Sequence, residues 1–210
     1  MIKVVPFIYD FDDELYANTY VLIDENNKCV VIDPGKAYAG IVEYIKKNNL
    51  SLTGILLTHG HVDHMRGVDT LVDAFNAPLY VGFDDEFMLS DNYANCSLFL
   101  EENVVIKSKA ITLADNEILR LLSEDIKVIT VPYHTAGSVC FYLEDSGLLF
   151  SGDFILPHGI GRSDLPNAKP KELSNSMAKI LSLPKETKIY GGHGAFSSLE
   201  LEMRVNPFVK

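Results

Sequence analysis

Histidine and aspartate side chains in this chain are spaced as metal ligands would be. Three histidines fall within one short run, and two more follow turns marked by glycine or proline much further along, as does one aspartate. Neutral imidazole and carboxylate are the ligands that borderline first-row cations such as zinc prefer. The candidate ligands are His59, His61, Asp63, His64, His134, Asp153 and His193.

The spacing within the first run predicts two neighbouring sites. In an extended turn, side chains two residues apart point the same way, so His59 and His61 can bind one ion. Gly60 lets the backbone pass close to that ion because it has no side chain. Asp63 and His64 are adjacent and are expected to diverge, so they can serve a second ion beside the first.

The downstream candidates complete these two sites. His134 would make the first a site of three imidazoles, and His193 would complete the second. Asp153 is placed to bridge both ions. Because one zinc takes only three or four ligands, the set predicts two divalent cations, with Zn²⁺ favoured and Fe or Mn as alternatives.

A pair of such cations predicts hydrolysis. Two divalent ions bring four positive charges, and the carboxylates of Asp63 and Asp153 with a bridging hydroxide remove three, which leaves a mildly cationic centre. Such a centre attracts a carbonyl or phosphoryl oxygen. Since a bound metal lowers the pKa of water from 15.7 to about 7, no serine or cysteine nucleophile is required.

Other residues near these turns have two interpretations each. Asp33, before Pro34, is either an exposed turn residue or an acceptor that orients a ligand imidazole. His158 is either a solvent-facing loop residue or a substrate contact, and Arg162 follows it in the same glycine-rich segment. The aromatic residues of segment 83–99 are expected in the core or an interface rather than in a substrate wall.

Composition narrows the class of protein. The formal charge of −11, without a cluster of Lys or Arg to offset it, argues against nucleic acid as a partner and for a small substrate. No run approaches the ~20 apolar residues of a membrane span, and the N-terminus lacks the zones of a secretory signal. The three cysteines have no metal-binding or disulfide spacing. We therefore expect a cytoplasmic protein that does not bind membranes, and leave a homo-oligomer open.

The ligands need a scaffold of strands and helices, which the apolar spacing predicts as one domain over residues 1–210. Segment 83–124 is irregular and is expected to be helical and loop material over the sheet edge. A capping-box spacing from Ser197 to Glu200 predicts a last helix, which Pro207 ends. Strands are predicted at 3–8, 18–24, 28–33, 54–58, 79–82, 126–132, 139–144, 148–152 and 188–191, with helices at 38–47, 68–75 and 173–181.

Taken in order, these motifs resemble the metallo-β-lactamase-fold superfamily. The motifs are His59-x-His61-x-Asp63-His64, the turn 133–138, Ser151-Gly152-Asp153 and Gly192-His193-Gly194. Segments 160–166, 95–97 and 206–208 are similar to its glyoxalase II-like, hydroxyacylglutathione hydrolase branch. The resemblance implies an α/β fold, a four-layer αβ/βα sandwich with the metals at one sheet edge, and the same ligand set. Tyr133 departs from the usual glycine and places a phenol beside His134. The sequence stops soon after His193, whereas glyoxalase II carries a C-terminal helical domain that helps bind glutathione, so a preference for glutathione is the least expected part of the resemblance.

The resemblance implies a binuclear hydrolase in which a bridging hydroxide attacks an acyl carbon, most simply of a thioester. Two alternatives remain on the same fold: a mononuclear-iron persulfide dioxygenase and a lactonase or β-lactamase-type hydrolase. A non-catalytic binding scaffold would require a missing ligand, and none of the seven is missing.

Overall fold

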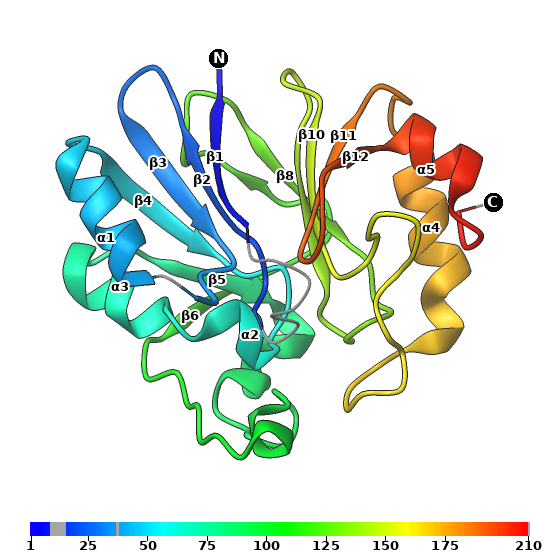
Figure 1. The fold of residues 1–210 in the computed structure, drawn as a ribbon, viewed down its shortest axis with the longest axis horizontal. Helices are drawn as coiled ribbons and strands as arrows, with labels where there is room; N and C mark the ends of the chain where they lie inside the picture. The colour runs from blue at the N-terminus through cyan, green and yellow to red at the C-terminus, as the bar shows by residue number, and fades with distance from the viewer. Residues whose placement is uncertain (9–15, 37, 210) are drawn as a thin grey trace.

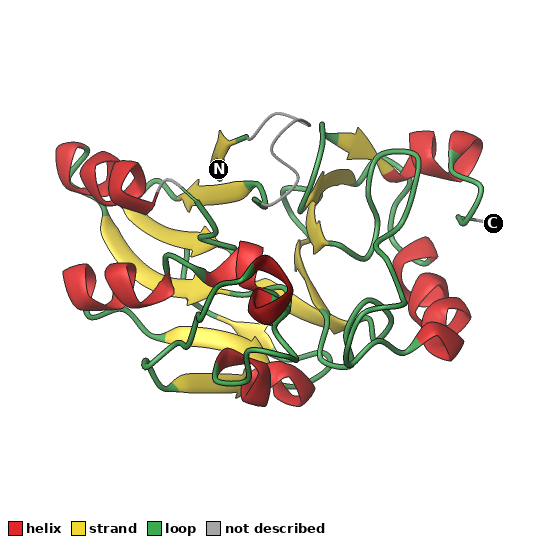
Figure 2. Cartoon of the chain, turned by 60° about the horizontal axis from the view of Figure 1, so that its bottom comes forward, coloured by secondary structure: helices red, strands yellow, loops and turns green. Residues whose placement is uncertain are grey.

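In a computed structural model of the protein, residues 1–8, 16–36 and 38–209 are described. Two six-stranded sheets face each other, and helices cover the outer side of each, α1 and α3 on one and α4 and α5 on the other (Figures 1 and 2). This is the predicted four-layer αβ/βα sandwich. The strands are β1 (Lys3–Phe7), β2 (Thr19–Ile23), β3 (Lys28–Ile32), β4 (Ser51–Leu56), β5 (Leu79–Gly82), β6 (Ala110–Leu113), β7 (Ile118–Leu119), β8 (Ile126–Thr130), β9 (Val139–Leu143), β10 (Leu148–Gly152), β11 (Lys188–Gly191) and β12 (Ser197–Ser198).

The helices are short. Ser198 is the N-cap of α5 and accepts a hydrogen bond from the Leu201 amide at 3.3 Å, so the predicted box beginning at Ser197 was one residue early. The Ser197 hydroxyl donates to Glu202 instead. Among the described helices, none has the length and apolar character needed to cross a membrane. The helices are α1 (Tyr38–Lys47), α2 (Val62–Met65), α3 (Val68–Phe75), α4 (Leu173–Leu181) and α5 (Leu199–Val205), with 3₁₀ helices η1 (Phe83–Leu89), η2 (Ser97–Leu100) and η3 (Pro170–Glu172).

The first sheet has the order β1-β2-β3-β4-β5-β6. Strands β1 to β3 form the predicted antiparallel meander, and β3 to β6 run parallel. Parallel neighbours need a crossover, which α1 supplies between β3 and β4 and α3 between β4 and β5. The carboxyl ends of these strands therefore meet at one edge of the sheet.

The second sheet has the order β12-β11-β10-β9-β8-β7. Strands β8, β9 and β10 form the second predicted meander, and β11 joins β10 in parallel after the crossover through α4. Because β8, β10 and β11 point the same way, the loops that follow them leave the sheet at a common edge.

Three apolar layers hold the sandwich together. Val31 of β3 faces a cluster between the first sheet and its helices, whereas its neighbour Val30 faces a cluster between the two sheets. This alternation is what a strand buried on both faces requires. Phe141 and Phe150 of the second sheet pack in the central layer between the sheets. Met177 of α4 packs in a third layer, on the outer face of the second sheet.

The prediction for segment 83–124 was incomplete. The 3₁₀ helices η1 and η2 lie there as expected, but so do β6 and β7, which form an edge of each sheet. Strand β7 has only two residues, and the two middle residues of β6 are both exposed. Neither sequence therefore shows the apolar alternation by which strands are recognised.

Candidate metal centre

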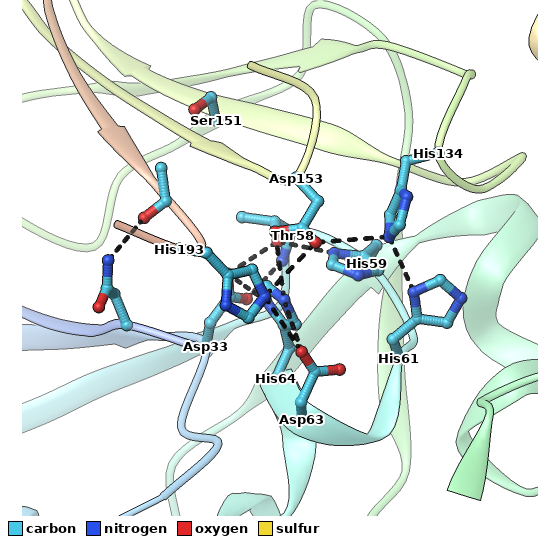
Figure 3. Close-up of polar contacts among 12 residues, drawn as sticks. Asp33, Thr58, His59, His61, Asp63, His64, His134, Ser151, Asp153 and His193 are labelled. Atoms are coloured by element: carbon cyan, nitrogen blue, oxygen red, sulfur yellow. Dashed lines mark hydrogen bonds and ion pairs between the residues drawn. The ribbon is translucent and has the colours of Figure 1, made fainter. Parts of the chain in front are cut away.

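The seven candidate ligands lie beyond the carboxyl ends of strands in both sheets. His59 and His61 follow β4, and Asp63 and His64 begin α2 directly afterwards. From the second sheet, the other three follow its parallel strands: His134 after β8, Asp153 after β10 and His193 after β11. Both sheets thus contribute to one site, which Figure 3 shows in close-up.

The first group, His59, His61 and His134, is the predicted three-imidazole site. One ring nitrogen from each residue lies within 4.8 Å of the others. His61 Nδ1 and His134 Nε2 are 2.9 Å apart. The three side chains are buried, with no residue more than 3% exposed. This group offers three imidazoles in a compact arrangement.

The second group, Asp63, His64 and His193, meets the same distance limit. Asp63 Oδ2 is 3.2 Å from His193 Nε2 and 3.5 Å from His64 Nε2. The expectation that Asp63 and His64 diverge was wrong in detail. The extended segment ends at His61, and the two residues lie in the first turn of α2, where their polar ends converge.

Asp153 lies between the two groups (Figure 3). Its Oδ1 is 3.5 Å from His64 Nε2, and its Oδ2 is 3.6 Å from His134 Nε2 and 3.5 Å from His193 Nε2. One carboxylate thus lies beside imidazoles of both groups.

Asp33 orients candidate ligands of both groups. Its carboxylate accepts hydrogen bonds from the Thr58 amide (2.8 Å) and hydroxyl (2.7 Å) and lies 2.9 Å from His64 Nδ1. The Thr58 hydroxyl is in turn 3.1 Å from His59 Nδ1. With Nδ1 held in this way, the Nε2 atoms of both histidines are left for a cation. Asp33 is 1% exposed, so the interpretation as an exposed turn residue is excluded.

Four buried polar atoms in the centre have no hydrogen-bond partner: His59 Nε2, His61 Nε2, His64 Nε2 and Asp153 Oδ1. Buried polar groups are rarely left unsatisfied, and each one needs an explanation. The other ring nitrogen of His61 faces His134. Unpartnered nitrogen and oxygen donors that converge fit one or two divalent cations of the zinc, iron or manganese type.

Electrostatics differ between the two groups. Burial lowers the pKa of His59 well below its usual value and that of His61 to about 3. Burial also acts on His64, but the negative charges of Asp63, Asp33 and Asp153 outweigh it and raise that pKa well above its usual value. Burial therefore favours the neutral imidazole at His59 and His61, whereas the neighbouring carboxylates favour the protonated imidazole at His64.

The carboxylates of the centre stay ionised. Burial favours the neutral acid, but neighbouring His64 and His193 lower the pKa of Asp63 to about 2. The same histidines hold the pKa of Asp153 well below its ordinary range despite burial. Negative charge is thus concentrated where cations would bind.

The turn carrying His193 is held by the first sheet. The Asn18 amide donates to the Gly192 carbonyl at 2.6 Å, and the Asn18 side chain donates to the Gly194 carbonyl at 2.9 Å. A Cβ on Gly192 would lie 2.2 Å from Asp153 Oδ1, so only glycine permits this approach.

Asp85 is a buried carboxylate that the sequence did not single out. It accepts hydrogen bonds from the amides of Gly60 (3.0 Å) and Gly137 (2.8 Å) and from the Thr135 hydroxyl (2.6 Å). These donors belong to the two turns that carry the first group, so Asp85 ties the turns together. Its neighbours in sequence are acidic too, and no pattern distinguishes it.

The remaining candidates lie outside the cluster. The carbonyl of Arg162 is 2.7 Å from His134 Nδ1, whereas its side chain pairs with Asp164. His158 is exposed, and it is not among the described residues that line the cavity beside the centre. Tyr133 is adjacent to His134 in sequence, but its ring packs in the third apolar layer, edge-on to Phe154, and the phenol does not line the cavity either.

A cavity of about 940 Å³ opens beside the centre and is lined by His61, Asp63, His134, Asp153 and His193, among others. Tyr93 and Phe99 also line it and are 58% and 55% exposed. These aromatic residues were expected in the core or an interface, and their exposure excludes the core. A lone aromatic residue gives no signal in sequence that separates a core from a cavity wall.

The fold is a four-layer sandwich, and its histidines and aspartates cluster where the strands end. Together these features define a class of metal-binding proteins. Comparison with known proteins identifies the family. The family model of the metallo-beta-lactamase superfamily matches residues 12–193. The probable metallo-hydrolase YqgX of Bacillus subtilis (strain 168) is 33% identical over 197 residues, which cover 93% of each chain. The hydroxyacylglutathione hydrolase GloC of Haemophilus influenzae is 28% identical, over 91% of this chain and 92% of that protein.

Solved structures agree. The BLEG-1 B3 metallo-beta-lactamase superimposes with a TM-score of 0.90 at 33% identity and covers 100% of both chains. TTHA1623 in a di-iron-bound form gives 0.84 at 32% identity, over 98% of this chain and 100% of that one. The chain therefore belongs to the metallo-β-lactamase superfamily, a superfamily of metallo-hydrolases.

Proposed function

We propose that this protein is a glyoxalase II-like hydrolase that cleaves acyl thioesters at a binuclear metal centre. The position of Asp153, with oxygens 3.5 to 3.6 Å from imidazoles of both ligand groups, is the observation that carries the proposal. A carboxylate shared in this way suits two neighbouring cations better than one. The similarity to GloC supports the thioester as substrate.

In the proposed centre, His59, His61 and His134 would hold the first cation and Asp63, His64 and His193 the second, and Asp153 would be available to both. Two divalent cations bound there would make hydroxide available near neutral pH and stabilise negative charge on the substrate oxygen. Asp33 and the Arg162 carbonyl keep the ligand nitrogens aimed at the centre. The cavity would give the substrate access to the five candidate ligands that line it.

The cavity cysteine is a poor nucleophile. Burial raises the pKa of Cys96 to about 11, so it is a thiol rather than a thiolate at neutral pH. The chain therefore supplies no activated sulfur beside the centre, which supports attack by water.

Metal analysis and a substrate panel test the proposal. The purified chain loaded with Zn²⁺, Mn²⁺ or Fe²⁺ is expected to hold two ions and to release thiol from S-D-lactoylglutathione, and chelation is expected to reduce release to the background rate. Asp63→Ala is expected to leave one ion per chain, because only the second group loses a ligand. Undiminished hydrolysis by the metal-free chain would refute the proposal.

A second candidate has support of its own. His59, His64 and Asp153 also form a compact group, and two histidines with one carboxylate are the ligand set of non-haem iron oxygenases. One iron per chain, with oxygen uptake on glutathione persulfide and no thiol release from thioesters, would favour that dioxygenase. Because BLEG-1 is described as a metallo-beta-lactamase, lactones and β-lactams complete the panel.

A further inference from the structure

We propose, on the basis of the hydrolase function proposed above, that the cavity binds an uncharged, apolar part of the substrate. The protein then prefers neutral thioesters with apolar substituents over thioesters of an anionic thiol such as glutathione. The volume of about 940 Å³ leaves room for a substituent well beyond the reacting carbonyl.

Part of the cavity wall is apolar. Tyr93, Phe99 and Leu100 line it from the segment around η2, and Ile160 and Leu165 line it from the loop after β10. The rings of Tyr93 and Phe99 lie 5.4 Å apart and are more than half exposed. Because covering exposed apolar surface is favourable, such a wall binds an alkyl or aryl group in preference to a charged one.

The charged side chains of the cavity do not attract an anion beyond the metal centre. Arg162 is the only lysine or arginine among the described residues that line it. Its guanidinium already pairs with Asp164 through two contacts of 2.9 Å. Residues 9–15, outside the described structure, contain four acidic residues and no lysine or arginine, so they cannot supply a cation.

Two further cations lie near the rim but have partners. Lys36 Nζ is 4.0 Å from the centre of the Tyr16 ring, and the guanidinium carbon of Arg66 is 5.1 Å from it. Arg66 also forms an ion pair of 2.9 Å with Glu102. Tyr16 lines the cavity and these two side chains do not. A glutathione carboxylate would thus have to displace an existing contact.

Thioesters that differ only in chain length or thiol test the proposal. The Zn²⁺-loaded chain is assayed with N-acetylcysteamine thioesters from acetyl to octanoyl and with glutathione thioesters of the same acids. We expect kcat/KM to rise roughly two- to four-fold for each added methylene. We also expect each glutathione ester to be no better than its neutral counterpart. A flat series, or faster glutathione esters, would overturn the proposal.

Two neighbouring residues of η2 provide a matched pair of variants. Leu98 and Phe99 are 57% and 55% exposed, but only Phe99 lines the cavity. Phe99→Ala is expected to lower kcat/KM for the octanoyl ester roughly ten-fold and to leave the acetyl ester much less affected. Leu98→Ala is expected to preserve the whole series. If both variants changed the dependence on chain length equally, Phe99 would not be part of the wall that binds the acyl chain.

Binding of inert analogues separates this proposal from the hydrolase function. Amides that replace the thioester sulfur with nitrogen are titrated into the Zn²⁺-loaded chain by calorimetry. If no thioester is hydrolysed but the amides bind more tightly with each methylene, the hydrolase function fails and the apolar site stands. If thioesters are hydrolysed while neither rate nor binding depends on chain length, the apolar site fails and the hydrolase function stands.

Discussion

The two ligand groups of the candidate centre, which form its two halves, are built differently. The three imidazoles of the first group are almost completely buried, and burial keeps His59 and His61 neutral. In the second group, the side chains of Asp63 and His193 are 19% and 26% exposed, and the pKa of His64 is raised. Buried neutral donors favour tight binding without competition from protons. We infer that the first half is the more permanent metal site and the second the more exchangeable one.

Loss of the Asp153 carboxylate should remove the difference in metal binding between the two halves. Asp153→Ala is expected to lower the occupancy of both halves and reduce hydrolysis to the background rate, because its oxygens lie beside ligands of each group. Elemental analysis and thiol release provide the measurements. A variant that keeps two ions per chain would show that Asp153 does not bridge the halves.

Asp33→Asn should weaken both halves through their ligands. Asparagine tolerates the positive φ of 51° at this position. However, asparagine offers one acceptor oxygen instead of two, so its NH₂ group would face either the Thr58 amide or the pair formed by the Thr58 hydroxyl and His64 Nδ1. We expect metal affinity to fall roughly ten- to hundred-fold, measured by competition with a chelating dye.

Asp24→Asn is the control for that variant. Asp24 is also a buried carboxylate, and it accepts from the amides of Asn26, Lys28 and Ser123, away from the centre. Its substitution is expected to lower the free energy of unfolding while metal affinity stays unchanged. An equal loss of metal affinity in both variants would show that Asp33 acts only by stabilising the fold.

Asp85→Asn should affect the first half alone. Either orientation of the new amide group turns its NH₂ toward the Gly60 or the Gly137 amide, so one of these donors loses its acceptor. We expect a smaller loss, of roughly ten-fold, in affinity at the three-histidine site. The visible spectrum of the Co²⁺-loaded chain would report the altered geometry. Asp84→Asn, at the exposed neighbouring position, should leave the spectrum unchanged.

Acidification should distinguish the metal affinities of the two halves without any change in sequence. In the metal-free chain, burial is outweighed by Asp153 and Asp63, so the pKa of His193 is raised, as is that of His64. Protons therefore compete with a cation at the second half as pH falls through these raised values, while His61 stays neutral down to about pH 3. Dialysis from pH 8 to pH 5 should take the metal content from two ions to one. Loss of both ions over the same pH range would contradict the inferred difference between the two halves.

The sequence predicts the ligand cluster better than its surroundings. Histidines and aspartates at turns are rare enough to be recognised by type and spacing, and all seven residues selected in this way lie together in the fold. Asp85 was missed because its role depends on two turns that are far apart in sequence, at residues 60 and 135–137. Strands β6 and β7 were missed because edge strands this short carry little apolar alternation.

The lining of the cavity was the least predictable feature of the site. Tyr93 and Phe99 are ordinary apolar residues in the sequence, and only the fold places them on a cavity wall. The pairing of Arg162 with Asp164 is local in sequence, yet its importance depends on which other charges surround the cavity. The candidate ligands can thus be recognised by residue type and spacing, whereas the residues proposed to select the substrate can be recognised only by their tertiary position.

The candidate ligands come from both sheets, with Asp63 and His64 supplied by one and Asp153 and His193 by the other. A cation held there would join the two halves of the sandwich as a cross-link does. Binding would then be thermodynamically linked to folding, and each ten-fold increase in free cation above its Kd would add about 1.4 kcal/mol to the resistance of the chain to unfolding. Metal supply would in this way set how long the protein survives, in addition to how fast it turns over its substrate.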